Sequence, residues 1–473
     1  MSGLDPEDWS ELRALGHVIL DDMFDRLEGL RDTPVWQRMP DPLRMELHAG
    51  LPRDGMPPGR VYDEFRRLIA PYSVGNTHPR FMGWVHGGGT GIGMLAELLA
   101  GGLNANLGGR DHAPIEVERQ VVRWAAEMVG MPADSAGLLV TGSSIANMIA
   151  LLVARRHAAG PEVRTRGVGG HGLVGYAGHT AHGCVPRAFD MAGLGSEALR
   201  QVACDAGHRI SLPALEQAVA ADRAAGLQPF LVVGTAGAVD TGAVDDLAAL
   251  AAFCREQGLW FHVDGAFGAL AALSPRLRGQ LAGIGEADSL AFDFHKWAQA
   301  PYDAGCVLIR DPALQTDTFR QSLAYLAGAD RGVAANAPWP ADLGPDLSRG
   351  FRALKVWMTL KTYGADRMAR MVEDCCDVAL HLAARIEREP TLELLAPVNL
   401  NIVCFRLLRD GADLDFLNGE LVKDLHEAGI AVPSITTIDG RRAIRAAIVN
   451  HRTIDADVDA MIDGLLMLAR RRP

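Results

Sequence analysis

The chain has 473 residues, of which 48% are hydrophobic, and its 46 basic and 58 acidic residues give a net charge of −12 at pH 7. This length and apolar content describe an ordinary globular chain, long enough for a large domain with a smaller one beside it. The charges are spread without long blocks, which argues against a nucleic-acid partner.

The sequence shows no pattern typical of a targeting or membrane segment. It begins MSGLDPEDWSELRALG, which is acidic and lacks the basic-then-apolar order of a signal peptide. The uncharged run from Ser135 to Ala154 has the length of a membrane helix, but Thr141, Gly142 and Asn147 within it favour a strand, a loop and a helix. The seven cysteines are scattered, in no metal spacing, which favours a reducing compartment. We therefore expect a cytoplasmic protein with no metal and no membrane partner.

The N-terminal part has the pattern of a helical arm. Apolar residues recur at helical spacing between Pro6 and Leu30, and a second helical stretch runs from Val61 to Ile69. Proline and glycine are frequent between the two stretches. The arm has too little apolar content to fold alone, so it packs on another surface or remains a loosely attached extension.

An aromatic segment, HPRFMGWVH, comes next and is followed by glycines. The glycines from Gly87 to Gly91 lack a preceding strand and the spacing of a dinucleotide fingerprint, so that kind of site is not indicated. Helical patterns continue at Met94–Leu103 and Glu118–Gly130.

A strand, a turn of small residues and a helix are predicted in GLLVTGSSIANM, residues 137–148. Free backbone N–H groups at the start of a helix attract anions, and small residues let a phosphate approach closely. The hydroxyl groups of Ser143 and Ser144 can add hydrogen bonds to it. Serines also cap helices for structural reasons, so the motif alone leaves a phosphate site and a plain helix cap open.

Strands alternate with helices through the middle of the chain. Ala203–Asp205 and Phe230–Val233 have the pattern of strands, and the helix between them begins with Ser211 as its N-cap. The Asp246–Gln257 helix then leads to the apolar strand Leu259–Asp264. This alternation predicts a parallel sheet with crossover helices.

Two strand ends carry the residues that point most clearly to a chemistry. Asp264 ends its strand at the edge where open α/β sheets bind ligands. Lys296 lies in FDFHKW, between the apolar runs Ser289–Phe294 and Cys306–Ile309. An arbitrary lysine there is a surface residue, but a buried one can lose its charge and form a Schiff base with an aldehyde cofactor. Lysine for the aldehyde carbon and aspartate for the pyridine nitrogen are the parts of a pyridoxal phosphate site.

The C-terminal part predicts a small α+β domain. Apolar strands are expected at Ile402–Leu407 and Ala443–Val449, and helices at Phe416–Ala428 and Asp455–Ala469. Arg445 lies inside one of these apolar strands, where a charge needs a partner.

The signatures HVDGAF and FDFHKW, in this order, are similar to those of the group II pyridoxal-phosphate decarboxylases, which include aromatic amino acid, glutamate and cysteine sulfinate decarboxylases. The resemblance extends from about His78 to about Arg452. It implies the fold-type-I α/β fold with a mostly parallel, seven-stranded sheet. The expected parts are an N-terminal arm (1–77), a large cofactor-binding domain (78–350) and a small C-terminal domain (351–473). It also implies a homodimer with sites at the subunit interface, in which the arm of each chain packs on the partner subunit.

The resemblance assigns cofactor contacts to the residues that match the motifs. Lys296 holds the aldehyde and Asp264 the ring nitrogen, while His182 in AHGCVPRA, rather than its neighbour His179, stacks on the ring. One threonine that usually contacts the cofactor is Ala236 here. The other expected cofactor contacts lie in the two turns and the two signatures: Ser143, Ser144, Thr235, Ala266 and His295.

Substrate contacts also follow from the resemblance. Trp84 and His86 face the substrate by position, although Trp84 has even odds of being an ordinary core residue. Arg445 matches an arginine that meets the substrate carboxylate in glutamate decarboxylases, and a structural ion pair is an equal alternative.

A loop of unusual composition departs from the family pattern. Asp330–Arg349 is rich in Gly, Pro, Ala and Asp with little periodicity, so we expect a mobile loop. In the decarboxylases this loop carries a tyrosine that protonates the product carbon. Here no tyrosine lies between Tyr325 and Tyr363, and Asn336 stands near the corresponding place.

The function implied is decarboxylation of a small L-amino acid to the amine and CO2, through a Schiff base on Lys296. One alternative is oxidative deamination to an aldehyde, ammonia and peroxide. Another is cleavage of a carbon–carbon bond, as in sphingosine phosphate lyase, for which we identify no additional basic residues. The signatures disfavour transamination, and intact Lys296, Asp264 and His182 argue against a non-catalytic relative. The sequence does not identify the substrate side chain.

Overall fold

A seven-stranded sheet forms the centre of the fold in the computed structural model, which describes residues 3–321 and 328–472. The strand order is β1-β7-β6-β5-β4-β2-β3. Of these strands only β7 runs antiparallel to its neighbours, so the sheet is mostly parallel, as predicted. The strands are β1 (Ala136–Val140), β2 (Leu173–Gly178), β3 (Leu199–Val202), β4 (Gln228–Thr235), β5 (Trp260–Asp264), β6 (Ser289–Asp293) and β7 (Gly305–Ile309).

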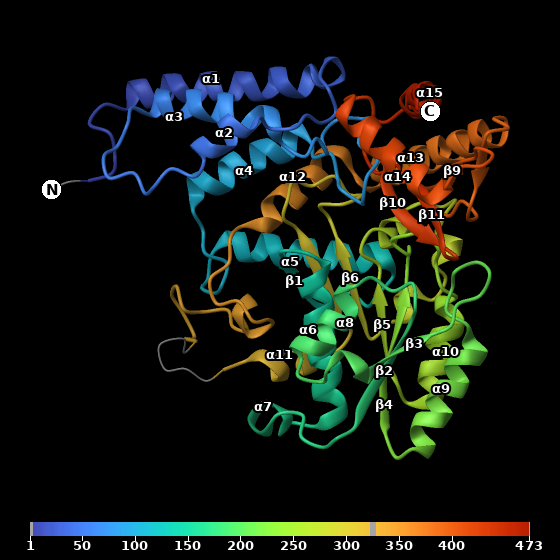
Figure 1. Cartoon of the computed structure of the whole chain (residues 1–473). Coiled ribbons are helices and arrows are strands. Elements are labelled where there is room, and N and C mark those ends of the chain that lie inside the picture. The colour runs from blue at the N-terminus through green and yellow to red at the C-terminus, as the bar shows by residue number, and fades with distance from the viewer. Residues whose placement is uncertain (1–2, 322–327, 473) are drawn as a thin grey trace.

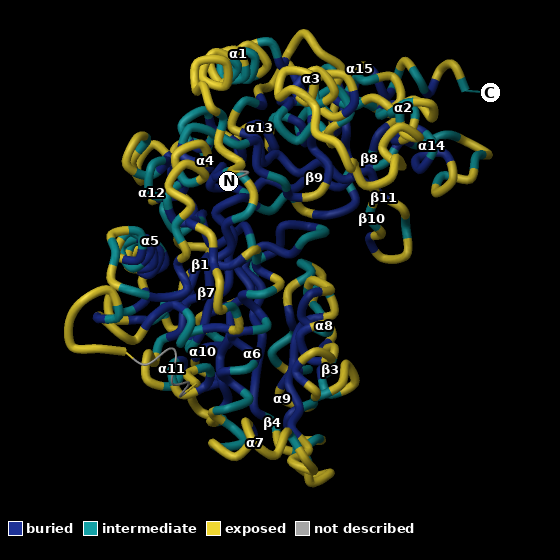
Figure 2. The backbone as a smooth tube through the Cα atoms, turned by 90° about the vertical axis from the view of Figure 1, so that its left-hand side faces the viewer, coloured by how far each residue is buried: buried dark blue, intermediate teal, exposed yellow. Residues whose placement is uncertain are grey.

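Side chains alternate between the two faces of this sheet, and helices cover both. In β4, Val232 packs into one core, whereas Leu231 and Val233 pack into the other. Because both faces are buried, the inner strands are mostly apolar and form the dark centre of Figure 2. The first core lies under α5 (Ala113–Val129), α9 (Leu212–Ala224) and α10 (Leu247–Gln257), and the second under α6 (Ser143–Ala159), α8 (Cys184–Met191) and α11 (Pro312–Phe319).

Polar side chains mark where several of these helices begin. Ser211 accepts a hydrogen bond from Ala214 N at 3.4 Å at the start of α9, as predicted, and Asp246 accepts one from Ala249 N at 3.0 Å at the start of α10. Helix α6 differs, because its N-cap residue is Gly142, which has no side chain to cap it. Its first N–H groups are therefore open to other partners.

The uncharged run from Ser135 to Ala154 forms β1, the turn of small residues and most of α6, as expected. Helix α7 (Val163–Arg166) follows it. In the part of the chain that the structure describes, no helix is both long and apolar enough to cross a membrane.

A second, four-stranded antiparallel sheet, of order β10-β11-β9-β8, is built by the C-terminal part of the chain. It lies at the upper right of Figure 1, in orange and red, and agrees with the predicted small α+β domain. Its strands are β8 (Leu392–Leu394), β9 (Ile402–Leu407), β10 (Ser434–Ile438) and β11 (Arg441–Ala447). The helices of this part are α12 (Arg352–Tyr363), α13 (Ala365–Glu387), α14 (Leu414–Glu427) and α15 (Asp455–Arg471).

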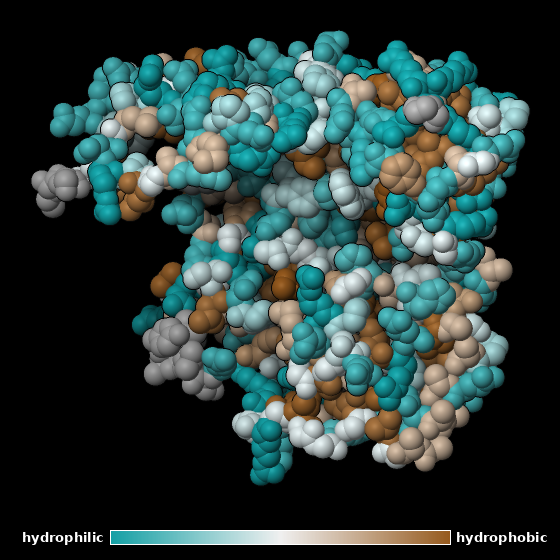
Figure 3. Space-filling view, viewed as in Figure 1, coloured by the Kyte–Doolittle hydropathy of each residue, from teal (hydrophilic) through white to brown (hydrophobic). Residues whose placement is uncertain are grey.

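The N-terminal helices lie together at the top of Figure 1. Helix α1 buries none of its residues, and its side of the molecule is mostly hydrophilic in Figure 3. Polar contacts attach it: the Tyr62 hydroxyl donates to Asp22 Oδ2 at 2.7 Å, and Arg31 Nη1 lies 2.8 Å from Asp457 Oδ1 in α15. The arm is therefore tied to the C-terminal part of its own chain. The helices of the arm are α1 (Trp9–Glu28), α2 (Asp41–Glu46) and α3 (Pro58–Glu64), and α4 (Gly91–Leu103) follows after the aromatic segment.

One predicted strand is misplaced. The strand expected at Ala203–Asp205 lies earlier, as β3 at Leu199–Val202, and Cys204 makes only an isolated bridge with Ile210. Because β3 is an edge strand with two polar residues in its middle, its short apolar pattern does not distinguish it from a loop.

The segment expected to be a loop packs on the large domain. Residues 328–349 contain one short 3-10 helix, Pro340–Asp342, and otherwise only turns and bends. Trp339 is 4% exposed, and the Arg110 guanidinium lies 4.9 Å over its ring. The prediction of little regular structure is confirmed, whereas the buried tryptophan was not predicted.

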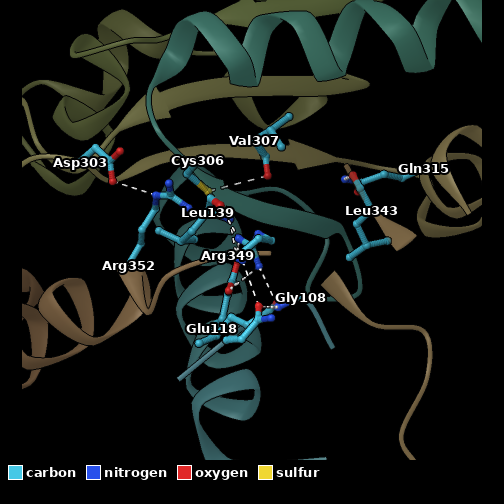
Figure 4. A network of polar contacts seen from close by, with 12 residues as sticks. Gly108, Glu118, Leu139, Asp303, Cys306, Val307, Gln315, Leu343, Arg349 and Arg352 are labelled. Carbon is cyan, nitrogen blue, oxygen red and sulfur yellow. Dashed lines mark hydrogen bonds and ion pairs between the residues drawn. The ribbon is translucent and has the colours of Figure 1, made fainter. Parts of the chain in front are cut away.

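A buried ion pair joins α5 to the segment before α12 (Figure 4). Arg349 Nη1 lies 2.9 Å from Glu118 Oε2 and Nη2 lies 2.6 Å from Oε1, and both residues are less than 5% exposed. Arg349 also donates to the carbonyl groups of Leu107 and Leu139, and Glu118 accepts Leu139 N–H at 2.9 Å. The pair therefore ties α5, β1 and the segment before α12 together.

Replacing Arg349 by methionine should lower the free energy of unfolding by about 3–5 kcal/mol, because it leaves the carboxylate of Glu118 buried and unpaired. Denaturant unfolding measures this loss. Arg166→Met is the matched control: Arg166 pairs with Glu162 at 2.8 Å on the surface, so its loss should change little. The double variant Glu118→Leu/Arg349→Met should be less destabilised than Arg349→Met, and an equal or larger loss would contradict this account.

Candidate active site

Polar side chains gather on the α6 side of β5 and β6, at the carboxyl ends of the strands. Alternation along β5 places His262 and Asp264 on the same face as Trp260. The pairing of His262 with Ser289 in β6 brings Asp293, at the end of β6, to the same edge. Open α/β sheets bind their ligands at this edge.

The ammonium group of Lys296 lies just beyond β6, against a carboxylate. Its Nζ is 2.8 Å from Asp293 Oδ2 and 3.4 Å from Ser143 Oγ. Burial lowers the pKa of Lys296, but the charge and hydrogen bond of Asp293 outweigh it, so the pKa is raised above its usual value. Lys296 is therefore held as an ammonium. Sequence reasoning predicted the lysine but missed its counter-ion.

The start of α6 binds the other oxygen of the same carboxylate. Asp293 Oδ1 accepts the Ser143 N–H at 2.6 Å, where Gly142 provides no cap. The Ser143 side chain is buried, whereas Ser144 is exposed. An internal anion thus occupies the turn that was predicted to bind a phosphate, as the free N–H groups and the helix dipole favour.

Asp264 is 4% exposed and is bound at both oxygens. Oδ1 accepts Ala266 N–H at 3.1 Å, and Oδ2 lies 3.9 Å from Cys184 Sγ. Burial raises the pKa of Asp264, while the positive charges of Lys296 and His182 oppose the rise. His182 is exposed, and its Nδ1 accepts Cys184 N–H at 3.2 Å. The carboxyl edge of the sheet therefore brings together Lys296, Asp264 and His182.

Thr235 ends β4 beside Asp264, as its partner in the parallel ladder. The carboxylate of Asp245 accepts both Thr235 N–H and Ile210 N–H at 2.7 Å, which fixes the turn after β4. Burial raises the pKa of Asp245 to about 6, although these two hydrogen bonds act to lower it.

His295 lies on the other side of the lysine and is 5% exposed. Its Nδ1 accepts Ala304 N–H at 3.0 Å, and its Nε2 lies 3.7 Å from Asp293 Oδ2. Burial lowers the pKa of His295, although Asp293 opposes the change. Its ring centre is 4.3 Å from that of Tyr302. His295 therefore connects the lysine to a group of aromatic rings.

These rings, which we call the aromatic wall, are Phe81, Trp84, His86 and Tyr302. His86 stacks on Phe81 at 5.7 Å and on Trp84 at 5.9 Å, and it meets Tyr302 edge-on at 5.9 Å. Trp84 is 51% exposed, so it is not the core residue that one interpretation allowed. Burial lowers the pKa of His86, and the nearby charge of Lys296 adds to the effect. The wall is therefore open on one side and close to the lysine on the other.

Arg445 is 3% exposed within β11. Its Nη1 donates to Ser434 Oγ at 3.1 Å, and burial lowers its pKa. Among the described residues it forms no ion pair, and it shares no hydrogen bond with the groups around Lys296. Neither interpretation of Arg445, as a substrate contact or as part of a structural ion pair, gains support from these contacts.

Sequence reasoning missed Asp293, Cys184 and Tyr302. Asp293 had a usable signal, because it ends an apolar strand as Asp264 does. Cys184 lies two residues after His182, but nothing in the sequence indicates that its sulfur faces Asp264. Tyr302 lies in an irregular segment, and only the fold brings it against His86 and His295.

Comparison with known proteins gives matches along nearly the whole chain. The family model described as the pyridoxal-dependent decarboxylase conserved domain matches residues 40–408. An aromatic-L-amino-acid decarboxylase of Bacillus atrophaeus is 32% identical, over 94% of this chain and 92% of its own length. A phenylacetaldehyde synthase of Arabidopsis thaliana is 28% identical, over 94% and 93%. The crystal structure of Oryza sativa TDC with PLP and tryptamine superposes with a TM-score of 0.91, at 26% identity and 99% coverage of both chains.

Proposed function

The chain belongs to the pyridoxal-dependent decarboxylase family, and from this premise we propose that it converts an aromatic L-amino acid to the amine and CO2. The observation that carries the proposal is the meeting of Lys296, Asp264 and the Ser143 turn at one edge of the sheet. When bound, pyridoxal phosphate supplies an electron-withdrawing ring that weakens the bond between the substrate's α-carbon and its carboxylate.

The residues at this edge fit that cofactor. The uncapped start of α6 binds an anion, since Ser143 N–H donates to the carboxylate of Asp293, and this supports an affinity of the turn for a phosphate. Lys296 supplies the amine for the aldehyde carbon. Asp264, buried with a raised pKa, gains a counter-charge from a protonated ring nitrogen. The remaining proposed cofactor contacts are Ser144, His182, Thr235, Ala266 and His295.

The chain's own groups divide the work among them. Asp264 would hold a proton on the ring nitrogen of the bound cofactor, and Ala266 N–H and Cys184 orient its two oxygens. The exposed His182, next to Asp264, is the group best placed to cover the ring and to deliver a proton. The aromatic wall meets His295 through Tyr302 and so borders the lysine on that side.

An aromatic substrate is proposed because of the aromatic wall. Trp84 and Tyr302 are 51% and 48% exposed and lie on either side of His86, so they present ring surface to a bound side chain. An acidic side chain would instead need an accessible cation, and Arg445 is buried against Ser434. The relative named aromatic-L-amino-acid decarboxylase agrees with this proposal.

A homodimer with its sites at the interface is also part of the proposal. Helix α4 exposes an apolar stripe, with Leu98, Leu99 and Leu103 each more than half exposed, which a second copy would cover.

All seven cysteines are free thiols, which supports a cytoplasmic location.

Oxidative deamination is the second candidate, because Asn336 stands near the place in the loop where we expect the phenol of the decarboxylases, and no tyrosine lies there. The side-chain Nδ2 of Asn336 donates to Asp111 Oδ1 at 2.8 Å, and its backbone carbonyl oxygen accepts from Arg119 Nη2 at 2.9 Å. An amide cannot act as a general acid, so no proton reaches the substrate's α-carbon from this position. With O2 and water taking part, loss of CO2 then ends as aldehyde, ammonia and hydrogen peroxide. Tyr325 lies outside the described residues.

Borohydride reduction of the holoenzyme, followed by peptide mapping, should find the pyridoxyl group on Lys296. Its side chain is 21% exposed, and its amine lies at the edge that fits the cofactor. Lys355 is the internal control, since it is buried on α12 and pairs with Glu97 of α4 at 2.5 Å. A label on Lys355, or no label on either lysine, would contradict the assignment.

Product partition between amine and aldehyde, measured in air and under argon, separates the two candidates. We expect mainly amine, with a minor aldehyde product in air that decreases when Asn336→Tyr supplies a phenol. Val333→Tyr is the control, because it adds a phenol at a 68% exposed position of the same segment. Aldehyde as the main product in air would favour oxidative deamination. Amine alone, unchanged in Asn336→Tyr, would show that the missing phenol has no consequence.

A further inference from the structure

We propose that His262 and Asn147 are positioning residues that hold Asp264 in a fixed orientation through a buried, one-directional chain of hydrogen bonds. The inference rests on the proposed function, in which Asp264 meets the cofactor ring. Neither residue is among the proposed contacts of the cofactor. Both lie beneath the carboxyl edge of the sheet, between β5 and α6.

The chain of contacts runs from the middle of the sheet to the edge. Every residue in it is at most 7% exposed. It begins with Trp260 Nε1, which lies 2.8 Å from Ser289 Oγ, and Ser289 Oγ lies 2.8 Å from His262 Nδ1. His262 Nε2 lies 2.6 Å from Asn147 Oδ1, and Asn147 Nδ2 lies 2.8 Å from Ser143 O and 3.5 Å from Cys184 Sγ. The last contact is between Cys184 Sγ and Asp264 Oδ2 at 3.9 Å.

The carbonyl group of Ser143 fixes the orientation of the Asn147 amide. A carbonyl oxygen only accepts, so the amide nitrogen must face it, and the amide oxygen must then face His262. That oxygen also only accepts. The hydrogen between them therefore lies on His262 Nε2, which assigns the tautomer from the network.

The indole of Trp260 fixes the other end. It only donates, so the Ser289 hydroxyl accepts from it and keeps its own hydrogen for His262 Nδ1. A doubly protonated imidazole could instead donate from Nδ1 to the Ser289 carbonyl, 3.2 Å away. Burial opposes this, because it lowers the pKa of His262 to about 4. His262 is therefore neutral, with its hydrogen on Nε2.

The direction of the chain determines what Asp264 receives. One Asn147 hydrogen goes to Ser143 O and the other to Cys184 Sγ, which leaves the thiol hydrogen for Asp264 Oδ2. Ala266 N–H binds Oδ1. Donors thus hold both oxygens from within the protein. One amide also links the Ser143 turn to Asp264, the two places proposed to bind opposite ends of the cofactor.

The experiment has two parts, and the first uses the native protein. Nitrogen NMR of histidine-labelled protein, assigned with His262→Gln, should show His262 neutral with its hydrogen on Nε2 from pH 5.5 to 9. An imidazolium, or a hydrogen on Nδ1, would overturn the proposal. This part needs no cofactor, so it stands even if the proposed function fails in the borohydride experiment.

The second part uses Asn147→Asp, which keeps the shape of the side chain but loses both donated hydrogens. The new carboxylate should make His262 charged at neutral pH, and the dissociation constant of pyridoxal phosphate should rise at least tenfold. Asn418→Asp is the matched control, because Asn418 is a fully buried amide in the small domain that donates to Leu407 O and Leu414 O. It should change neither quantity. Equal effects of the two substitutions on both quantities would overturn the proposal.

A smaller substitution tests the last link. Cys184→Ser keeps a hydrogen for Asp264, whereas Cys184→Ala removes it. Only the alanine variant should weaken cofactor binding and shift the pH dependence of the bound cofactor's absorption. If serine and alanine behave alike in both measurements, the thiol does not orient Asp264.

Discussion

The ion pair between the partly buried Lys296 and the buried Asp293 is the interaction on which the site depends. An isolated ammonium at this depth is strongly disfavoured, and so is an isolated carboxylate, so each needs the other 2.8 Å away. The second oxygen of Asp293 binds Ser143 N–H at 2.6 Å and so joins the end of β6 to the start of α6. The lysine and the anion-binding turn are therefore positioned by one side chain.

Alternation along the strands determines what else reaches this edge. In β5, every second residue faces α6, which places Trp260, His262 and Asp264 in one line while their neighbours fill the other core. A strand buried on both faces is normally apolar throughout, so the polar side chains in this line need partners from α6 and β6. Asn147 and Ser289 supply them. The apolar cores stabilise the sheet, and the polar residues of this line provide its reactive groups.

The sequence was sufficient to predict the parallel sheet, the cap of α9 at Ser211, and the meeting of Lys296 with Asp264, because each leaves a local pattern. It was not sufficient for contacts between elements. Alternation along a strand shows which face of the sheet a residue occupies, but not which residue of another element it contacts. The contact between Cys184 and Asp264 was therefore missed. The edge strand β3 was misplaced because one exposed edge leaves a weak apolar pattern. The roles of the individual site residues stay predictions.

The pKa of Lys296 in the protein without cofactor tests the central claim most directly. Carbon NMR of ε-labelled lysine can follow it, with Lys355, Lys361 and Lys423, the other lysines of the chain, as reference signals. Burial lowers this pKa and Asp293 more than offsets the effect, so the native value should lie above that of an ordinary lysine. In Asp293→Asn the effect of burial should dominate, and the pKa should fall. A native pKa below the ordinary value, or one that Asp293→Asn leaves unchanged, would contradict the account.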